Sequence, residues 1–282
     1  MRRSPARLLL PRFLAAAIFA FAALVVVMFL SQTRMIFPTD MVGPAGPLPP
    51  GAERIAFDTP GGDRLHGVHV PPRTAGQGPR TLVLGFGGNA WNGANVAAYL
   101  AELYPQADVI TFHYRGYRPS TGSPSAEALL ADAPLVLDYA IQRVRPDRTV
   151  AVGFSIGSGI AASLAKTGAV DGLILVTPFD SLKAVAQTLY PWLPVGPLFQ
   201  HEIDTAASLR GSAVPVAIIA AQRDDIIPPR RTEALRGRVA NVVFDRTIAG
   251  AGHNDIYNRD DFREAMGEAM DTIMDEHSPS GA

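Results

Sequence analysis

The sequence contains no cysteine, and this absence removes several kinds of chemistry together. Without a thiol the chain forms no disulfide, no zinc ribbon, no cysteine-ligated iron–sulfur cluster and no cysteine nucleophile. The six histidines are scattered and show no His-Glu-x-x-His or comparable ligand spacing. We therefore expect neither a metal site nor a cofactor.

Charge is also scarce. Only 18% of the residues are charged and the formal net charge is −1, so no basic field is present to hold phosphate backbones. We expect no nucleic-acid partner.

Hydrophobic residues make up 48% of the chain, which excludes a disordered protein and supplies a large core. A length of 282 residues fits one catalytic-sized α/β domain with an appendage.

An apolar run near the amino terminus predicts a membrane anchor. Residues 13–30 carry no charge, and a helix of this length covers about 27 Å, close to the hydrocarbon thickness of a bilayer. By the positive-inside rule, the N-terminus lies in the cytoplasm and residues 35–282 lie on the outer side, periplasmic or extracellular. The basic residues before the run are Arg2, Arg3, Arg7 and Arg12, against the single Arg34 after it.

A cleaved signal peptide is the alternative for this segment. The apolar core of a signal peptide is 7–15 residues long and ends at a small-residue cleavage site. Residues 28–32 offer no pair of small residues, and Ala20-Phe21-Ala22 lies inside the run. We therefore expect residues 1–34 to form an uncleaved single-pass anchor with a cytoplasmic, arginine-rich start.

The remaining chain divides into a linker, a domain and a tail. The proline- and glycine-rich residues 35–51 predict a semi-extended linker, and residues 277–282 a disordered tail. In residues 52–276 strand and helix patterns alternate, which predicts an α/β domain with a mostly parallel eight-stranded sheet and helices on both faces. The expected strands are 53–58, 65–70, 81–86, 107–112, 149–154, 172–177, 214–221 and 241–248, the first two as an antiparallel hairpin. The expected helices are 92–103, 126–144, 156–166, 181–190, 229–238 and 260–276.

The strongest candidate for a nucleophile is Ser155, in Gly153-Phe154-Ser155-Ile156-Gly157. This Gly-x-Ser-x-Gly pattern follows an expected strand and opens a helix of small residues, which is the setting of a nucleophile elbow. The glycines are needed because the serine sits in a strained turn and the helix packs close to the strand. The alternatives are a glycine-rich turn with a spectator serine and a phosphate-binding loop. The second lacks a Gly-Lys-Ser/Thr ending and an acidic ribose partner about 20 residues on.

A serine nucleophile needs a base and an orienting carboxylate, which follow it here in the order Ser, Asp, His. The expected strand 214–221 runs into Asp224 and Asp225, at the carboxyl edge of the sheet where sites collect. Asp224 is the candidate acid; Asp225 is the possible alternative acid, or a cap of the turn before Pro228. His253, on a glycine-rich loop after the last strand, is the candidate base. The other histidines are interpreted as structural or solvent-facing: His66, His69, His113, His201 and His277.

An oxyanion hole would use the backbone N–H of Ile156, which follows the serine, and a second N–H from the loop after the third strand. That loop, residues 85–92, is rich in glycine and places Asn89 as the second candidate donor. The alternative is a plain strand-to-helix turn that Asn92 caps.

With these motifs the sequence resembles the α/β-hydrolase family, in its small membrane-anchored, serine aminopeptidase-like branch, over about residues 34–270. The resemblance implies the α/β-hydrolase fold with little or no cap domain, and it favours Asp224 over Asp225 because Asp224 lies four residues before Pro228. Gly87 departs from the family pattern, in which a histidine is usual. Besides residues 153–157, the matching motifs lie at residues 86–90, 113–117, 177–182, 190–194, 224–228 and 252–255.

The resemblance also implies an activity. We expect a serine hydrolase that cleaves an acyl ester or thioester of a lipid or acylated substrate at a membrane surface, through an acyl-enzyme. A serine aminopeptidase-like peptide hydrolase is the alternative within the family. A non-catalytic membrane-tethered scaffold with the same fold is the alternative from another class, and the complete order of serine, aspartate and histidine argues against it.

Overall fold

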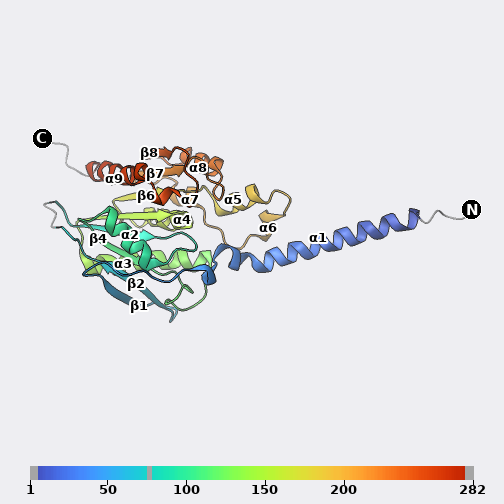
Figure 1. Cartoon of the computed structure of the whole chain (residues 1–282), viewed down its shortest axis with the longest axis horizontal. Coiled ribbons are helices and arrows are strands. Elements are labelled where there is room, and N and C mark those ends of the chain that lie inside the picture. The colour runs from blue at the N-terminus through green and yellow to red at the C-terminus, as the bar shows by residue number, and fades with distance from the viewer. Residues whose placement is uncertain (1–5, 75–77, 277–282) are drawn as a thin grey trace, which may run out of the picture.

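An eight-stranded sheet in the order β1-β2-β4-β3-β5-β6-β7-β8 runs through the protein, as the computed structural model shows for residues 6–74 and 78–276 (Figure 1). Strand β2 is antiparallel to both β1 and β4, and β3 to β8 are parallel. The predicted mostly parallel eight-stranded sheet and its leading hairpin are therefore confirmed. The strands are β1 Glu53–Asp58, β2 Arg64–Val70, β3 Thr81–Phe86, β4 Asp108–Phe112, β5 Arg148–Phe154, β6 Gly172–Val176, β7 Val216–Ala221 and β8 Val242–Ile248.

Helices cover both faces of the sheet, so the apolar residues of its inner strands are buried on both sides. One face carries α2 (Gly93–Leu103) and α9 (Asp260–Asp275), and the other carries α3 (Ala126–Val144), α4 (Ile156–Ser163), α7 (Thr205–Leu209) and α8 (Pro229–Arg236). The helix starts follow local capping chemistry. The side chain of Asn92 accepts a hydrogen bond from the N–H of Ala94, and that of Ser125 accepts one from Ala128.

The connection between β6 and β7 is more helical than the sequence indicates. The expected helix 181–190 appears as α5 (Leu182–Leu189), and two short helices follow it, α6 (Val195–Leu198) and α7. Prolines hide α6 from pattern reading, although Pro194 directly before it suits a helix start. Other boundaries also differ slightly. The expected helix 156–166 ends as an α-helix at Ser163 and continues as a 3₁₀ turn, β7 begins two residues after the expected 214, and α8 ends two residues before the expected 238.

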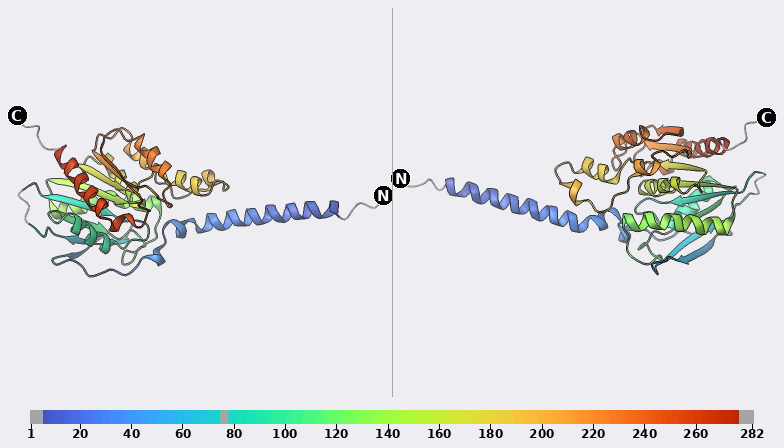
Figure 2. Two further views of the ribbon diagram at one scale, coloured as in Figure 1. Left: turned by 45° about the horizontal axis from the view of Figure 1, so that its top comes forward. Right: turned by 180° about the vertical axis from the view of Figure 1, so that it is seen from behind.

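Helix α1 (Ala6–Ile36) projects from one end of the domain, and both views of Figure 2 show it well away from the sheet. Its segment Pro11–Ile36 is long and apolar enough to cross a membrane, and none of its most apolar window is buried by the protein. This exposure distinguishes α1 from the core helix of a soluble protein, which is mostly buried. The expected basic residues Arg2 and Arg3, and the tail 277–282, lie outside the described residues.

Residues 35–51 do not form a free spacer. The carbonyls of Gly43 and Pro44 accept hydrogen bonds from the side chains of Asn92 and Asn95, and the N–H of Gly46 donates to Asn95. These bonds attach the segment to the start of α2. Helix α1 and the domain are thus connected by a chain that follows the protein surface.

One buried histidine makes the fold sensitive to acid. His113 follows β4, is only 7% exposed, and its Nδ1 has no hydrogen-bond partner in the described part of the chain. Burial, with a smaller effect of His66, lowers the pKa of His113 to about 4 from an ordinary value of 6.5. The unfolded chain therefore binds this proton more tightly than the folded chain does. Its contribution to stability is fully present above pH 6.5 and is lost as the pH falls toward 4.

We expect the unfolding free energy of the wild-type chain to fall between pH 7.5 and pH 5 by about 2 kcal/mol more than that of His113→Gln, which has no imidazole to protonate. Equilibrium denaturation of both full-length chains in a nonionic detergent, followed by tryptophan fluorescence, measures the difference. An equal pH dependence in the two chains would show that His113 accepts a proton in the folded state as readily as in water.

Candidate active site

Ser155 lies in a sharp turn between β5 and α4. Its backbone has φ 52° and ψ −119°, a left-handed conformation that side-chain-bearing residues rarely adopt. The N–H of Ser155 donates to the carbonyl of Val176 at the end of β6 (2.9 Å), which holds the turn against the neighbouring strand. Strain of this kind persists only where the surroundings impose it, and here it presents the serine side chain at the carboxyl edge of the sheet.

The flanking glycines are required by close packing. A Cβ at Gly153 would overlap with the backbone of Gly157, and a Cβ at Gly157 would overlap with the carbonyl oxygens of Phe86 and Gly87. Helix α4 therefore starts in direct contact with β5 and with the loop after β3. This contact brings Gly88 of that loop to the serine, since a Cβ at Gly88 would lie 3.8 Å from that of Ser155.

His253 lies within hydrogen-bond distance of the serine. Its Nε2 is 2.9 Å from Ser155 Oγ, and its Nδ1 is 2.8 Å from a carboxylate oxygen of Asp224. Because an ionised carboxylate only accepts, the ring hydrogen is on Nδ1 and Nε2 accepts from the serine hydroxyl. Asp224 and His253 are 8% and 5% exposed, so water competes little for their contact.

Asp224 is fixed from its other side. Its second carboxylate oxygen accepts the backbone N–H groups of Ile226 (3.0 Å) and Ile227 (2.6 Å), so Asp224 itself caps the turn before α8. Asp225, the alternative acid, is exposed and makes no hydrogen bond or ion pair with His253 in the described part of the chain. The structure thus brings together Ser155, His253 and Asp224, and leaves Asp225 outside.

The loop after β3 is supported by two tyrosines from the loop after β4. The Tyr114 hydroxyl donates to the carbonyl of Gly87 (2.7 Å), and the Tyr117 hydroxyl donates to that of Asn89 (2.8 Å). Tyr114 therefore supports the position where the family usually has a histidine. Sequence reasoning found the motif 113–117 but assigned these tyrosines no role. Of the two candidate oxyanion donors, Asn89 is exposed and Ile156 is buried.

An aromatic cluster links the three loops that carry these residues. Trp91 belongs to the loop after β3, Phe154 precedes the serine, and Tyr257 follows the histidine loop. The ring centroids of Trp91 lie 5.1 Å from those of both Phe154 and Tyr257. Displacing any one loop would therefore disturb the packing of the other two.

The other histidines lie elsewhere. His69 pairs with the buried Asp108 (2.7 Å), His113 is buried in the core, and His201 contacts Thr33 of α1 (2.7 Å). His277 lies outside the described residues. Among residues 6–74 and 78–276, no group of three acidic or histidine side chains is placed to hold a metal ion.

The strand order and the placement of Ser155, Asp224 and His253 after β5, β7 and β8 define an α/β-hydrolase fold. The chain belongs to the α/β-hydrolase family. The family described as "alpha/beta hydrolase fold" matches residues 82–207. The uncharacterized protein Rv2307c of Mycobacterium tuberculosis is 34% identical over 251 residues, which cover 85% of this chain and 87% of that protein.

Further relatives indicate the same class. Lysophosphatidylserine lipase ABHD12 of Danio rerio is 28% identical over 214 residues, which cover 64% of this chain and 56% of that protein. Est1E of Butyrivibrio proteoclasticus, solved with ferulic acid, is similar with a TM-score of 0.64 at 15% identity, over 78% of this chain and 99% of that one. An α/β hydrolase of Vibrio vulnificus is similar with a TM-score of 0.63 at 20% identity, over 87% and 90%. The fold and these relatives support a hydrolase.

The contact at Gly157 predicts a sharp difference between two glycine substitutions. Gly157→Ala pushes α4 away from the loop after β3, and we expect it to lower the unfolding free energy by about 1–3 kcal/mol. Gly267→Ala in α9 meets no atom within 4 Å, and we expect it to raise the unfolding free energy by about 0.5–1 kcal/mol. Denaturation of the two full-length variants measures both. Equal stabilities would contradict the close packing described here.

Proposed function

We propose that the protein is a serine hydrolase that cleaves an acyl ester or thioester at a membrane surface. The observation that carries the proposal is the hydrogen-bonded series from Ser155 Oγ through His253 to the buried carboxylate of Asp224, built on a strained turn. A serine hydroxyl is a weak nucleophile, and it becomes effective when an adjacent imidazole accepts its proton. A turn of this kind would be costly for a spectator serine.

The mechanism follows from this arrangement. His253 takes the hydroxyl proton as Ser155 Oγ attacks the acyl carbonyl, and Asp224 stabilises the imidazolium that forms. The backbone N–H groups of Asn89 and Ile156 bind the oxyanion. The imidazolium then gives its proton to the leaving alcohol or thiol, and an acyl-enzyme remains. His253 next activates a water molecule, which attacks the acyl-enzyme and releases the acid and the free serine.

The membrane location is supported by α1. Its exposed apolar segment Pro11–Ile36 is long enough to span, and its basic residues precede the apolar run. We propose that residues 1–34 anchor the chain with its amino terminus in the cytoplasm, and that the catalytic domain, residues 52–276, lies on the outer side. A relative named as a lipase supports an acyl ester as substrate.

Labelling with a fluorophosphonate probe tests the nucleophile. In the full-length chain in detergent, Ser155→Ala should abolish labelling and lower ester turnover by at least about 10⁴-fold, because the attacking group is removed. Ser163→Ala, at the other end of α4, is the matched control and should label as the wild type does. Labelling that persists in Ser155→Ala would overturn the assignment.

Substituting the two neighbouring aspartates one at a time tests which of them is the catalytic acid. Asp224→Asn should lower kcat by about 10³–10⁴-fold, because an amide no longer favours the hydrogen on Nδ1 or balances the imidazolium. Asp225→Asn should stay within twofold of the wild type. Turnover of a short-chain ester by the folded variants measures both. If Asp225→Asn alone loses activity, the acid is assigned to the wrong residue.

A further inference from the structure

Helix α1 is joined firmly to the segment between β6 and β7. We define the α5–α6 segment as residues 182–199. The Gln32 side chain donates to the carbonyl of Leu198 (3.2 Å) and accepts from the N–H of Gln200 (2.9 Å). Thr33 Oγ1 lies 2.7 Å from Nε2 of His201, a buried residue. The anchor helix therefore has a defined position against the domain.

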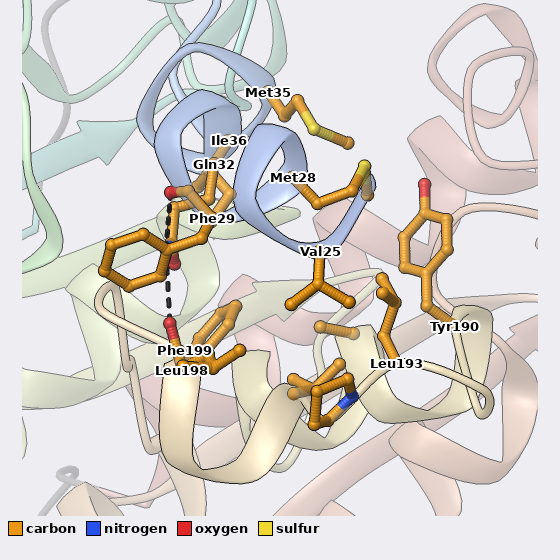
Figure 3. A pocket seen from close by; sticks show the side chains of 13 residues that line it. Val25, Met28, Phe29, Gln32, Met35, Ile36, Tyr190, Leu193, Leu198 and Phe199 are labelled. Carbon is orange, nitrogen blue, oxygen red and sulfur yellow. Dashed lines mark hydrogen bonds between the residues drawn. The ribbon is translucent and has the colours of Figure 1, made fainter. Parts of the chain in front are cut away.

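An open pocket lies between α1 and the α5–α6 segment (Figure 3). Side chains of the two elements face one another across it, among them Val25 and Met28 from α1 and Leu193 from the segment. Ala186 of α5 also lines the pocket. No charged residue lines the pocket. The side chain of its one glutamine, Gln32, is already hydrogen-bonded to backbone. The lining therefore favours a hydrocarbon occupant.

The pocket lies at the depth of the lipid hydrocarbon. Arg34 is exposed and forms an ion pair with Asp40 (2.6 Å), and we expect such a charged pair at the end of an apolar helix to lie at the membrane surface. Val25 precedes Arg34 by nine residues, so it lies about 14 Å deeper along the helix. Half of a hydrocarbon core of about 30 Å is about 15 Å. The pocket is thus within one leaflet.

The α5–α6 segment follows α1 into the apolar layer. The ring of Trp192, between α5 and α6, lies 6.5 Å from that of Phe21, one turn further from Arg34 than Val25. Phe21 precedes Arg34 by 13 residues, about 20 Å along the helix, so this contact lies near the middle of the bilayer. Trp192 is half exposed, although tryptophan carries a large apolar surface. Figure 1 shows α5 and α6 at the end of the domain from which α1 projects. Lipid would cover the exposed face of this tryptophan.

The chain that leads into the α5–α6 segment starts beside the candidate nucleophile. The N–H of Ser155 donates to the carbonyl of Val176, the last residue of β6. The chain then reaches α5 at Leu182, and Ala186 on the pocket lies about 6 Å further along that helix. Residues 177–181 therefore link the strand end that binds the serine turn to α5, which forms part of the pocket wall.

We propose that this pocket binds the acyl chain of a membrane lipid ester while Ser155 attacks the carbonyl of that ester. The inference rests on the proposed function and specifies its substrate as a long-chain ester that enters from the outer leaflet. The anchor helix then forms one wall of the substrate site in addition to holding the protein at the membrane.

Filling the pocket from either wall tests the proposal. The full-length chain is placed in phosphatidylcholine vesicles, and kcat/KM is measured for p-nitrophenyl esters of a 16-carbon and a 4-carbon acid. In Val25→Phe and in Ala186→Phe we expect the ratio of long-chain to short-chain kcat/KM to fall at least about tenfold, because a filled pocket excludes several methylenes. Leu189→Phe, on the same helix but outside the lining, is the control and should keep the wild-type ratio. An unchanged ratio in both filled variants would overturn the proposal and would mean that bulk lipid alone occupies the pocket.

A binding measurement separates this inference from the proposed function. The Ser155→Ala chain is irradiated in vesicles that contain a phosphatidylcholine with a diazirine on its acyl chain, and the labelled residues are mapped by mass spectrometry. We expect labels concentrated at residues 25–36 and 186–199 and removed by Ala186→Phe. Concentrated labels together with a wild-type chain that hydrolyses no ester would reject the proposed function and support the pocket. Labels spread evenly along α1 together with normal ester turnover would reject the pocket alone.

Discussion

Helix α4 begins so close to the neighbouring backbone that no side chain fits at Gly153 or Gly157. This close packing forces Ser155 into its left-handed turn, with φ 52°. It also presses the start of the helix against the loop after β3, so that the serine and Gly88 meet at one edge of the sheet. Every other part of the site is arranged around this contact, because the loops after β7 and β8 have to reach a serine whose position is already determined.

Those loops are held by interactions at two levels. Hydrogen bonds orient the polar groups: backbone N–H groups hold the Asp224 carboxylate, the carboxylate holds the ring of His253, and the ring reaches Ser155. Trp91 of the loop after β3 packs against Phe154, which precedes the serine, and against Tyr257, which follows the histidine loop. The geometry of the site therefore depends on packing as much as on hydrogen bonding.

The contact between α1 and the α5–α6 segment gives the domain an orientation. A flexible linker would leave the carboxyl edge of the sheet free to face in any direction. Instead, Gln32 and Thr33 bond to residues 198–201, and Asn92 and Asn95 hold the chain that follows the anchor. In the arrangement proposed here, the edge that carries Ser155 faces the lipid, and a substrate reaches it without crossing water.

The sequence by itself determined the class of fold, because local patterns record alternating strands and helices. It also predicted the apolar helix and the candidate residues Ser155, Asp224 and His253, the serine from its place between close-packing glycines. It left Asp224 and Asp225 as competitors by spacing alone. Only the tertiary structure placed Asp224 against His253 and Asp225 in solvent, since a strand end aims neighbouring side chains in different directions. The tyrosine supports at Gly87 and Asn89 and the pocket between α1 and α5–α6 were also decided there. These contacts join residues 27 or more positions apart, and no local pattern encodes them.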